Sequence, residues 1–143
     1  MNSTSNQTSY LILAGTYPAV TLSSGLAAGS YTLMYTGPST AGLITDLLFR
    51  NASTGAVNLN IIISATGSQT TEANSRVQVQ VPASAGNNGT TPLASLAAMA
   101  PLLFDLDLAG NRIILLESGI SVYVQNVAAL TGDLNITAKA RNF

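Results

Sequence analysis

Two acidic residues, Asp105 and Asp107, have the spacing in this sequence that comes closest to a metal site. Residues i and i+2 of a β-strand point to the same face, so both carboxylates could reach one cation. Calcium and magnesium sites recruit further oxygen ligands, and no calcium-loop pattern surrounds this pair. We therefore expect two solvated charges on the polar side of a strand, with no metal and no cofactor.

Catalysis would have to proceed without the most versatile side chains, because the chain contains no histidine and no cysteine. It thus lacks the commonest general base, and no serine can form a Ser–His–Asp triad. The carboxylates that remain are Asp46, Glu72, Asp105, Asp107, Glu117 and Asp133. Their spacing does not indicate a glycosidase pair. We predict that the protein is not an enzyme; the alternative is a carboxylate-dependent hydrolase acting on cell-wall polysaccharide.

The charge content is low: 8% of the 143 residues are charged, against roughly 25% in an ordinary soluble domain. A net charge of −1 leaves no electrostatic footprint for nucleic acid. Hydrophobic residues make up 47%, yet the most apolar run, 93–104, is interrupted by Pro101 and is too short for a membrane helix. The sequence predicts no nucleic-acid partner and no membrane span. Its surface is either rich in Ser, Thr, Asn and Gln or buried against other copies.

Alternation of apolar and polar residues dominates the chain and predicts half-buried antiparallel strands. In 57–65, Leu59, Ile61 and Ile63 share one face. In 102–108 the same pattern predicts that four side chains point inward, those of Leu102, Phe104, Leu106 and Leu108. The segments predicted as strands are 9–14, 18–22, 30–36, 43–51, 57–65, 76–81, 102–108, 120–126 and 134–140. Eight or nine strands separated by turn residues predict one all-β domain over 1–143, a β-sandwich or barrel.

Residues 82–101 interrupt this rhythm, with a flexible tip at 86–89 and a stretch, 93–100, suited to a short helix or an apolar arm. So long a loop in a compact domain is usually functional or disordered, so we weigh an inter-subunit contact against a mobile surface loop. The N-terminal segment 1–10 is a second candidate arm. Tyrosine and arginine are both common at interfaces. The residues expected at such contacts are Tyr10, Tyr17, Leu93, Leu96 and Met99.

From Gly42 to the C-terminus the sequence resembles small virion proteins of tailed bacteriophages. The resemblance rests on "ITDLLFRNAS" and "AVNLNIIIS", then "PLLFDLDLAGNRIILLESGISVYVQN" and the closing "LTGDLNITAKA". Such proteins form trimers of compact β-sandwich or jelly-roll domains. The resemblance implies an antiparallel jelly-roll-like sandwich and a capsid cement or decoration protein. It also implies a homotrimer on the capsid surface of the virion, bound to the major capsid protein or other virion proteins.

The alternative with the same fold is a tail- or head-fibre-associated module that binds a receptor or a glycan. Such a module should line a groove with exposed aromatic side chains. The chain has five tyrosines, three phenylalanines and no tryptophan, which favours the structural role over the glycan-binding one.

Overall fold

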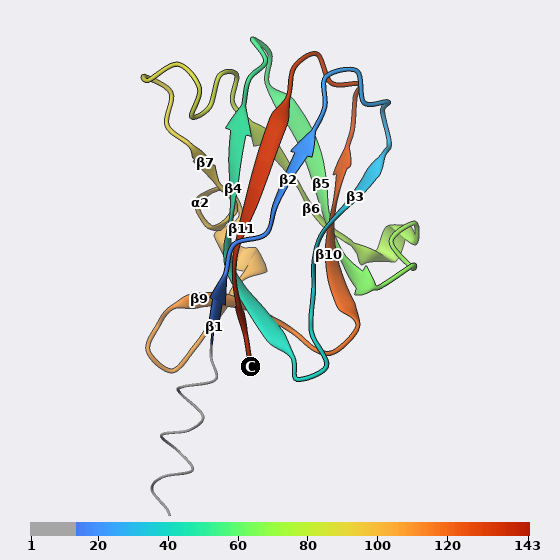
Figure 1. Cartoon of the computed structure of the whole chain (residues 1–143), viewed down its shortest axis with the longest axis vertical. Coiled ribbons are helices and arrows are strands. Elements are labelled where there is room, and N and C mark those ends of the chain that lie inside the picture. The colour runs from blue at the N-terminus through green and yellow to red at the C-terminus, as the bar shows by residue number, and fades with distance from the viewer. Residues whose placement is uncertain (1–13) are drawn as a thin grey trace, which may run out of the picture.

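The computed structural model describes residues 14–143, which form two antiparallel β-sheets that face each other (Figure 1). The seven-stranded first sheet contains β1 (Ala14–Thr16), β2 (Ala19–Leu22), β4 (Gly42–Asn51), β7 (Ala94–Ser95), β8 (Asp105–Leu106), β9 (Arg112–Leu116) and β11 (Leu134–Asn142). The four-stranded second sheet contains β3 (Tyr31–Thr36), β5 (Val57–Ala65), β6 (Ser75–Val81) and β10 (Ile120–Asn126). The helical turns are η1 (Glu72–Asn74), α2 (Leu96–Met99) and η2 (Pro101–Leu103). In this part of the chain no helix has the length and apolarity needed to cross a membrane.

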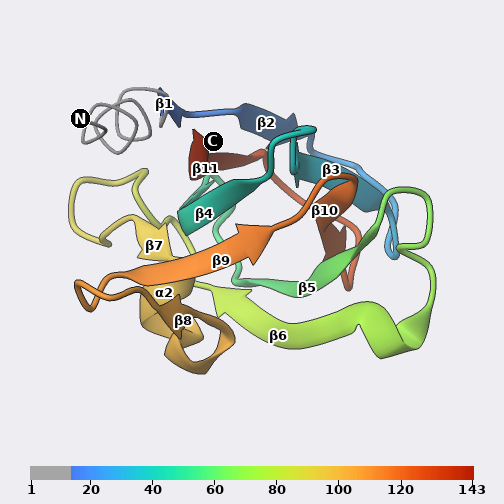
Figure 2. The ribbon, with the colours of Figure 1, turned by 90° about the horizontal axis from the view of Figure 1, so that it is seen from below.

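The strand order is that of a jelly roll. The first sheet runs β1-β11-β4-β9-β8, with β2 also on β11 and β7 also on β4, and the second runs β3-β10-β5-β6. The first strands thus pair with the last, β3 with the penultimate β10, β4 with β9, and β5 with β6, like one long hairpin folded over. Figure 2 shows the two layers side by side. The predicted all-β antiparallel sandwich is confirmed.

The sheets contain eleven strands rather than eight or nine, because β7 and β9 were not predicted. β7 has only two residues, and β9 follows the turn after β8. β1 and β2 lie along the same strand, β11, and are separated at Pro18, which has no N–H to donate to the ladder. The predicted strand over 9–14 falls almost entirely outside the described residues.

The core lies between the sheets and depends on a bulge in β4. Ile44 and Leu47 are both fully buried although three residues apart, whereas a regular strand would turn one of them outward. The register with β11 shifts between Ile44 and Asp46, so Thr45 is an extra residue on β4. This bulge leaves Thr45 and Asp46 half-buried between two core residues. The bulge thereby determines which side chains of β4 lie on the outer face of the first sheet.

Two glycines allow the sheets to close on each other at one end of the sandwich. A Cβ on Gly42 would collide with the Tyr35 hydroxyl, and one on Gly37 would lie 2.7 Å from the carbonyl oxygen of Leu116. The Tyr35 hydroxyl donates to the side-chain oxygen of Asn142, which joins β3 of the second sheet to β11 of the first. Any larger residue at either glycine would push the strands apart.

The predicted strand over 102–108 is wrong. Pro101 begins the 3-10 turn η2, and only Asp105 and Leu106 pair, with β9. Phe104 is buried as expected, but Leu102, Leu106 and Leu108 are exposed. β8 lies at the edge of its sheet. Because no second sheet faces it there, the alternating side chains are not buried. The neighbouring strand β9, with the apolar sequence RIILL, was not predicted, because its polar residues do not alternate.

Residues 82–101 pack against the first sheet. The Asn51 N–H donates to the Ala85 carbonyl at 2.9 Å, and β7 pairs with Leu48 and Phe49 of β4. Asp46 holds the start of α2, since its carboxylate accepts from the Ala97 N–H at 3.0 Å and from the Ser95 hydroxyl at 2.5 Å. The segment is therefore packed against the sheet rather than an extended apolar arm, and its contact with another subunit stays a prediction. Its tip at 86–90 is exposed.

Candidate assembly surface

Four leucines between residues 102 and 115 have largely exposed side chains. Leu102 and Leu108 are completely exposed, and Leu106 and Leu115 have relative exposures of 68% and 55%. Single exposed apolar residues are common, but several in one region mark interaction sites. Burying a leucine side chain contributes about 1.5–3 kcal/mol. This region can therefore supply a substantial free energy of association.

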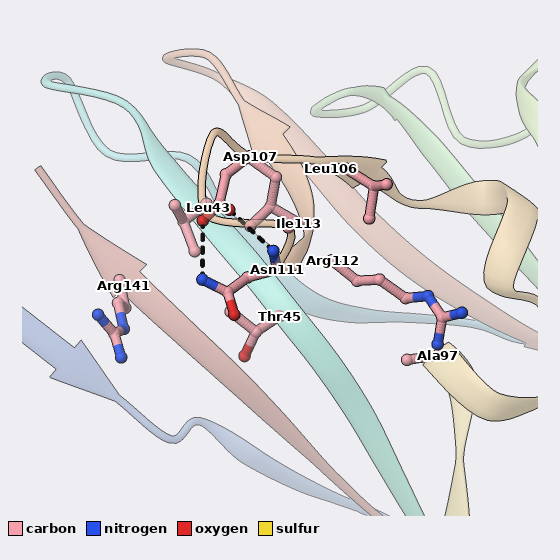
Figure 3. Close-up of a pocket in the computed structure, with 10 residues that line it drawn as sticks. Leu43, Thr45, Ala97, Leu106, Asp107, Asn111, Arg112, Ile113 and Arg141 are labelled. Carbon is pink, nitrogen blue, oxygen red and sulfur yellow. Dashed lines mark hydrogen bonds between the residues drawn. The ribbon is translucent and has the colours of Figure 1, made fainter.

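A hollow of about 640 Å³ lies next to these leucines, between β11, β4, α2 and the turn from β8 to β9 (Figure 3). Leu106 lines it together with Arg112 on one side, and Arg141 lines it on the other. Thr45, the extra residue of the β4 bulge, also lines it. Leu115 pairs in register with Leu43, another lining residue, which connects the fourth exposed leucine to the hollow.

The turn beside this hollow is held by Asp107. Its carboxylate accepts from the backbone N–H groups of Ala109 at 2.9 Å and Asn111 at 2.8 Å, and from the Asn111 side-chain amide at 3.2 Å. The backbone N–H of Asn111, then its side-chain amide, lower the pKa of Asp107 below its ordinary value. Asp107 thus stabilises the turn through hydrogen bonds, while Asp105 is exposed on the edge strand β8. Residues 14–143 contain no group of three or more His, Cys, Asp or Glu residues suited to a metal ion.

Basic residues gather around this hollow and a second one of about 570 Å³, which shares Thr45 and Arg141 with it. Arg112, Lys139 and Arg141 are three of the five basic residues of the chain. Of the other two, Arg50 donates to the Asn87 side chain at 2.6 Å, and Arg76 donates to the Ile63 carbonyl at 3.2 Å and lines a further hollow beside Leu102. The positive charge of the molecule is therefore concentrated beside the exposed leucines.

A third, mostly apolar hollow of about 400 Å³ lies where η2 approaches β6. Met99 and Leu102 line it, together with Val77 of β6. The helix α2 contributes to both neighbouring hollows, through Ala97 to the first and Met99 to the third. We call the three hollows and the exposed leucines the assembly surface. Its main residues are Tyr17, Met99, Leu102, Leu106, Leu108, Arg112, Leu115, Lys139 and Arg141.

The structure places the five predicted contact residues in different environments. Tyr17, 68% exposed, lines the second hollow, and Met99 lines the third. Leu93 is exposed on the loop after the 86–90 tip, away from these lining sets. Leu96 was wrongly expected at a contact, because its side chain is fully buried in the core. Tyr10 lies outside the described residues.

Leu102, Leu106 and Leu108 were missed because they were predicted to point inward, and Leu115 was missed because its strand, β9, was not predicted. The signals that could have exposed the error are Pro101, which favours a helical turn, and the Ala109-Gly110-Asn111 turn, which ends the alternation.

No protein-family model matches this chain, and no curated protein matches it. One similar solved structure is a chain from the Bacillus endospore appendages, a family of disulfide-linked pili, with a TM-score of 0.43 and 14% identity over 91% of this chain and 87% of that one. Another is a chain of the cyanophage Pam1 capsid asymmetric unit, with a TM-score of 0.44 and 13% identity over 92% and 85%. The chain is thus weakly similar to a phage capsid protein and to a pilus protein. Likeness at this level assigns neither a family nor a function.

Proposed function

We propose that this chain is a structural protein of a tailed-bacteriophage particle, a decoration or cement protein that binds the outer capsid surface as a homotrimer. The observation that carries the proposal is the assembly surface, with its exposed leucines beside three basic residues on an otherwise weakly charged molecule. The sequence resemblance from Gly42 onward supports the same role. The work of such a protein is mechanical and needs no catalytic residue.

Within the trimer, the leucines face a second copy of the chain. A cyclic trimer repeats one heterologous contact three times and closes on itself, so each leucine region meets a different patch of its neighbour. At about 1.5–3 kcal/mol for each buried leucine, the exposed side chains of Leu102, Leu106 and Leu108 can hold this contact. Arg112, Lys139 and Arg141 then remain to meet carboxylates of a neighbour or of the capsid protein.

On the particle, many copies add their separate contacts with the major capsid protein. Each trimer presents three identical surfaces, and simultaneous binding makes the later contacts intramolecular. Modest binding by one copy thus becomes firm attachment by three. This arrangement strengthens a shell without requiring any one contact to be strong.

The first test is the solution mass, measured by light scattering on a sizing column. A trimer of the 14.6 kDa chain would weigh about 44 kDa and should persist on dilution. The second test is co-sedimentation with capsids of the phage that encodes the chain, which should bind the trimer at their outer surface. A monomer at every concentration, both free and on the particle, would rule out the trimer; failure to co-sediment would rule out decoration.

A further inference from the structure

The outer face of the second sheet carries a groove that the proposed assembly does not use. After β5 the chain runs through residues 66–74 and covers this face. The Tyr123 hydroxyl accepts from the Gly67 N–H at 3.2 Å, and Ile62, which is in register with Tyr123, is only 2% exposed. Ile61 points into the core, so its neighbour Ile62 points outward and is buried by this covering segment. A groove of about 500 Å³ remains between the segment and the strands.

Amide and hydroxyl side chains line most of this groove. Tyr31, Asn60 and Gln125 come from three adjacent strands, β3, β5 and β10. The covering segment adds Gln69, Glu72 and two threonine hydroxyls. The Tyr31 side chain is 37% exposed, so one aromatic ring stands at the groove beside the polar groups. The groove thus combines polar groups with one of the exposed aromatic side chains that the glycan-binding alternative expects.

The amides of the groove are oriented before any ligand binds. Asn60 donates to the Gln125 side-chain oxygen at 3.0 Å, and Gln125 donates to the Gly29 carbonyl at 3.3 Å. These bonds occupy the Gln125 oxygen and direct its amide group, so a ligand does not need to order it. Fixing such groups in advance lowers the entropic cost of binding.

Gln69 has a buried side-chain oxygen without a hydrogen-bond partner. Buried polar atoms nearly always have a hydrogen-bond partner, and a buried polar atom without one destabilises the fold. Gln69 lines the groove, so a rotation of its amide group would let this oxygen accept from a hydroxyl donor there. An amide with an unused acceptor at the groove favours a ligand that donates hydrogen bonds.

The charges of the lining narrow the class of ligand. Glu72 is the only charged residue that lines the groove, and no basic side chain does. A phosphate, sulfate or carboxylate would therefore meet a like charge without a countercharge. One carboxylate is also too few for a metal site of the kind proteins build from several oxygen ligands. An apolar ligand would leave the amides unmatched.

We propose that this groove binds a neutral saccharide. Sugar hydroxyls both donate and accept, as do the amides of Asn60, Gln69 and Gln125. The Tyr31 ring offers an apolar face to the C–H groups of a sugar ring. The groove shares no lining residue with the three hollows of the assembly surface, although Ser75 of the groove and Val77 of the third hollow both belong to β6.

The test uses maltotriose, cellotriose and chitotriose as probes and follows backbone amide resonances of the full chain by NMR. At least one sugar should shift resonances of Gln69, Glu72 and Gln125 with a Kd in the millimolar range. Gln125→Leu should weaken this binding about tenfold, since one strong hydrogen bond to the ligand is lost. Tyr31→Ala, at a partly exposed position, should weaken it several-fold through lost packing.

The matched control is Gln80→Leu, because Gln80 is an exposed glutamine of the same sheet that lies outside the groove and donates to Asn58 at 3.2 Å. It should bind sugar like the unmodified chain. No shift by any of the three sugars at about 10 mM would overturn the proposal. Equal losses of sugar affinity in the Gln125 and Gln80 variants would overturn the assignment to this groove. Resonance shifts of the groove residues with inorganic phosphate would overturn the conclusion that the ligand is neutral.

Discussion

The two sheets of this protein present very different outer surfaces, although both are built from the same alternating strands. At the α2 and β8 edge of the first sheet, leucines are exposed beside three basic residues. On the second sheet, two outward-pointing apolar side chains, Ile62 and Tyr123, are buried beneath the chain's own residues 66–74, Leu33 of β3 is 45% exposed, and amides line a groove beside them. The comparison shows that low average charge conceals two specialised surfaces. We propose the first for association with other protein chains and the second for a small polar ligand.

The largest expected effect is on trimer formation, which should depend on the leucines of the assembly surface and not on the second sheet. Leu102→Asn, Leu106→Asn and Leu108→Asn together should weaken trimer formation at least about a thousandfold, because more than about 4 kcal/mol of apolar burial is lost. Light scattering over a dilution series measures this change. The control is Leu33→Asn, a leucine 45% exposed on β3 of the second sheet, which should leave the mass unchanged. A triple variant that stays trimeric would show that these leucines do not hold the trimer.

Two adjacent leucines of β9 sharpen the contrast between core and assembly surface. Leu116 is fully buried, and Leu116→Ala should lower the free energy of unfolding by about 2–5 kcal/mol. Leu115 is 55% exposed, and Leu115→Ala in the monomer should change that free energy by less than about 0.5 kcal/mol. Urea unfolding of the two variants, each made in the chain that also carries Leu102→Asn, Leu106→Asn and Leu108→Asn and is expected to be monomeric, provides the measurement. Equal losses would mean that Leu115 is also a core residue.

Smaller effects are expected at the basic residues. Arg112→Gln and Arg141→Gln should each weaken capsid binding by a few-fold, because exposed ion pairs contribute about 0–1 kcal/mol. They should also reduce the dependence of binding on salt, which screens such pairs. Co-sedimentation at low and high salt tests both statements. Arg50→Gln is the matched control, since Arg50 bonds to the 86–90 tip rather than lining the hollows; the same loss in all three variants would point to overall charge instead.

The smallest effect concerns the turn that carries Leu108. The pKa of Asp107 is lowered in the folded chain by the Asn111 N–H and side-chain amide, so the ionised carboxylate is the form that the fold favours. Its stabilisation is present above the ordinary aspartate pKa of about 3.9 and is lost as the pH falls through the lower folded value. Amide exchange at Ala109 and Asn111 should therefore accelerate in strong acid. Asp107→Asn should remove most of this pH dependence; an unchanged profile would assign it to another group.

Much of the fold could be predicted from local patterns. The alternation in 57–65 and 120–126 predicts β5 and β10 almost to the residue, because both strands bury one face against the opposite sheet. The same pattern in 102–108 is misleading. No sheet covers that edge, so the leucines that alternate there remain exposed. The β4 bulge at Thr45 was equally hidden, since nothing in the sequence marks an unpaired residue within a strand.

The candidate sites could be predicted from the sequence less well than the strands. Tyr17 and Met99 were predicted as contact residues, and both line hollows of the assembly surface, while their role in a contact stays a prediction. The saccharide groove could not be located in this way, because Asn60 and Gln125 meet only through the register of β5 and β10. Gln69 reaches them because the segment after β5 folds back over its own sheet.

By itself the sequence determined the alternating strands, their turns, the low charge, and the absence of histidine and cysteine that removes the usual catalytic side chains. Tertiary structure alone decided which of the outward side chains are covered, where three basic residues gather, and which amides face one groove. The physical reason is that burial and hydrogen bonding depend on what packs over a residue. In a jelly roll those neighbours come from strands far away in the chain, such as β11 beside β1 and β10 beside β3.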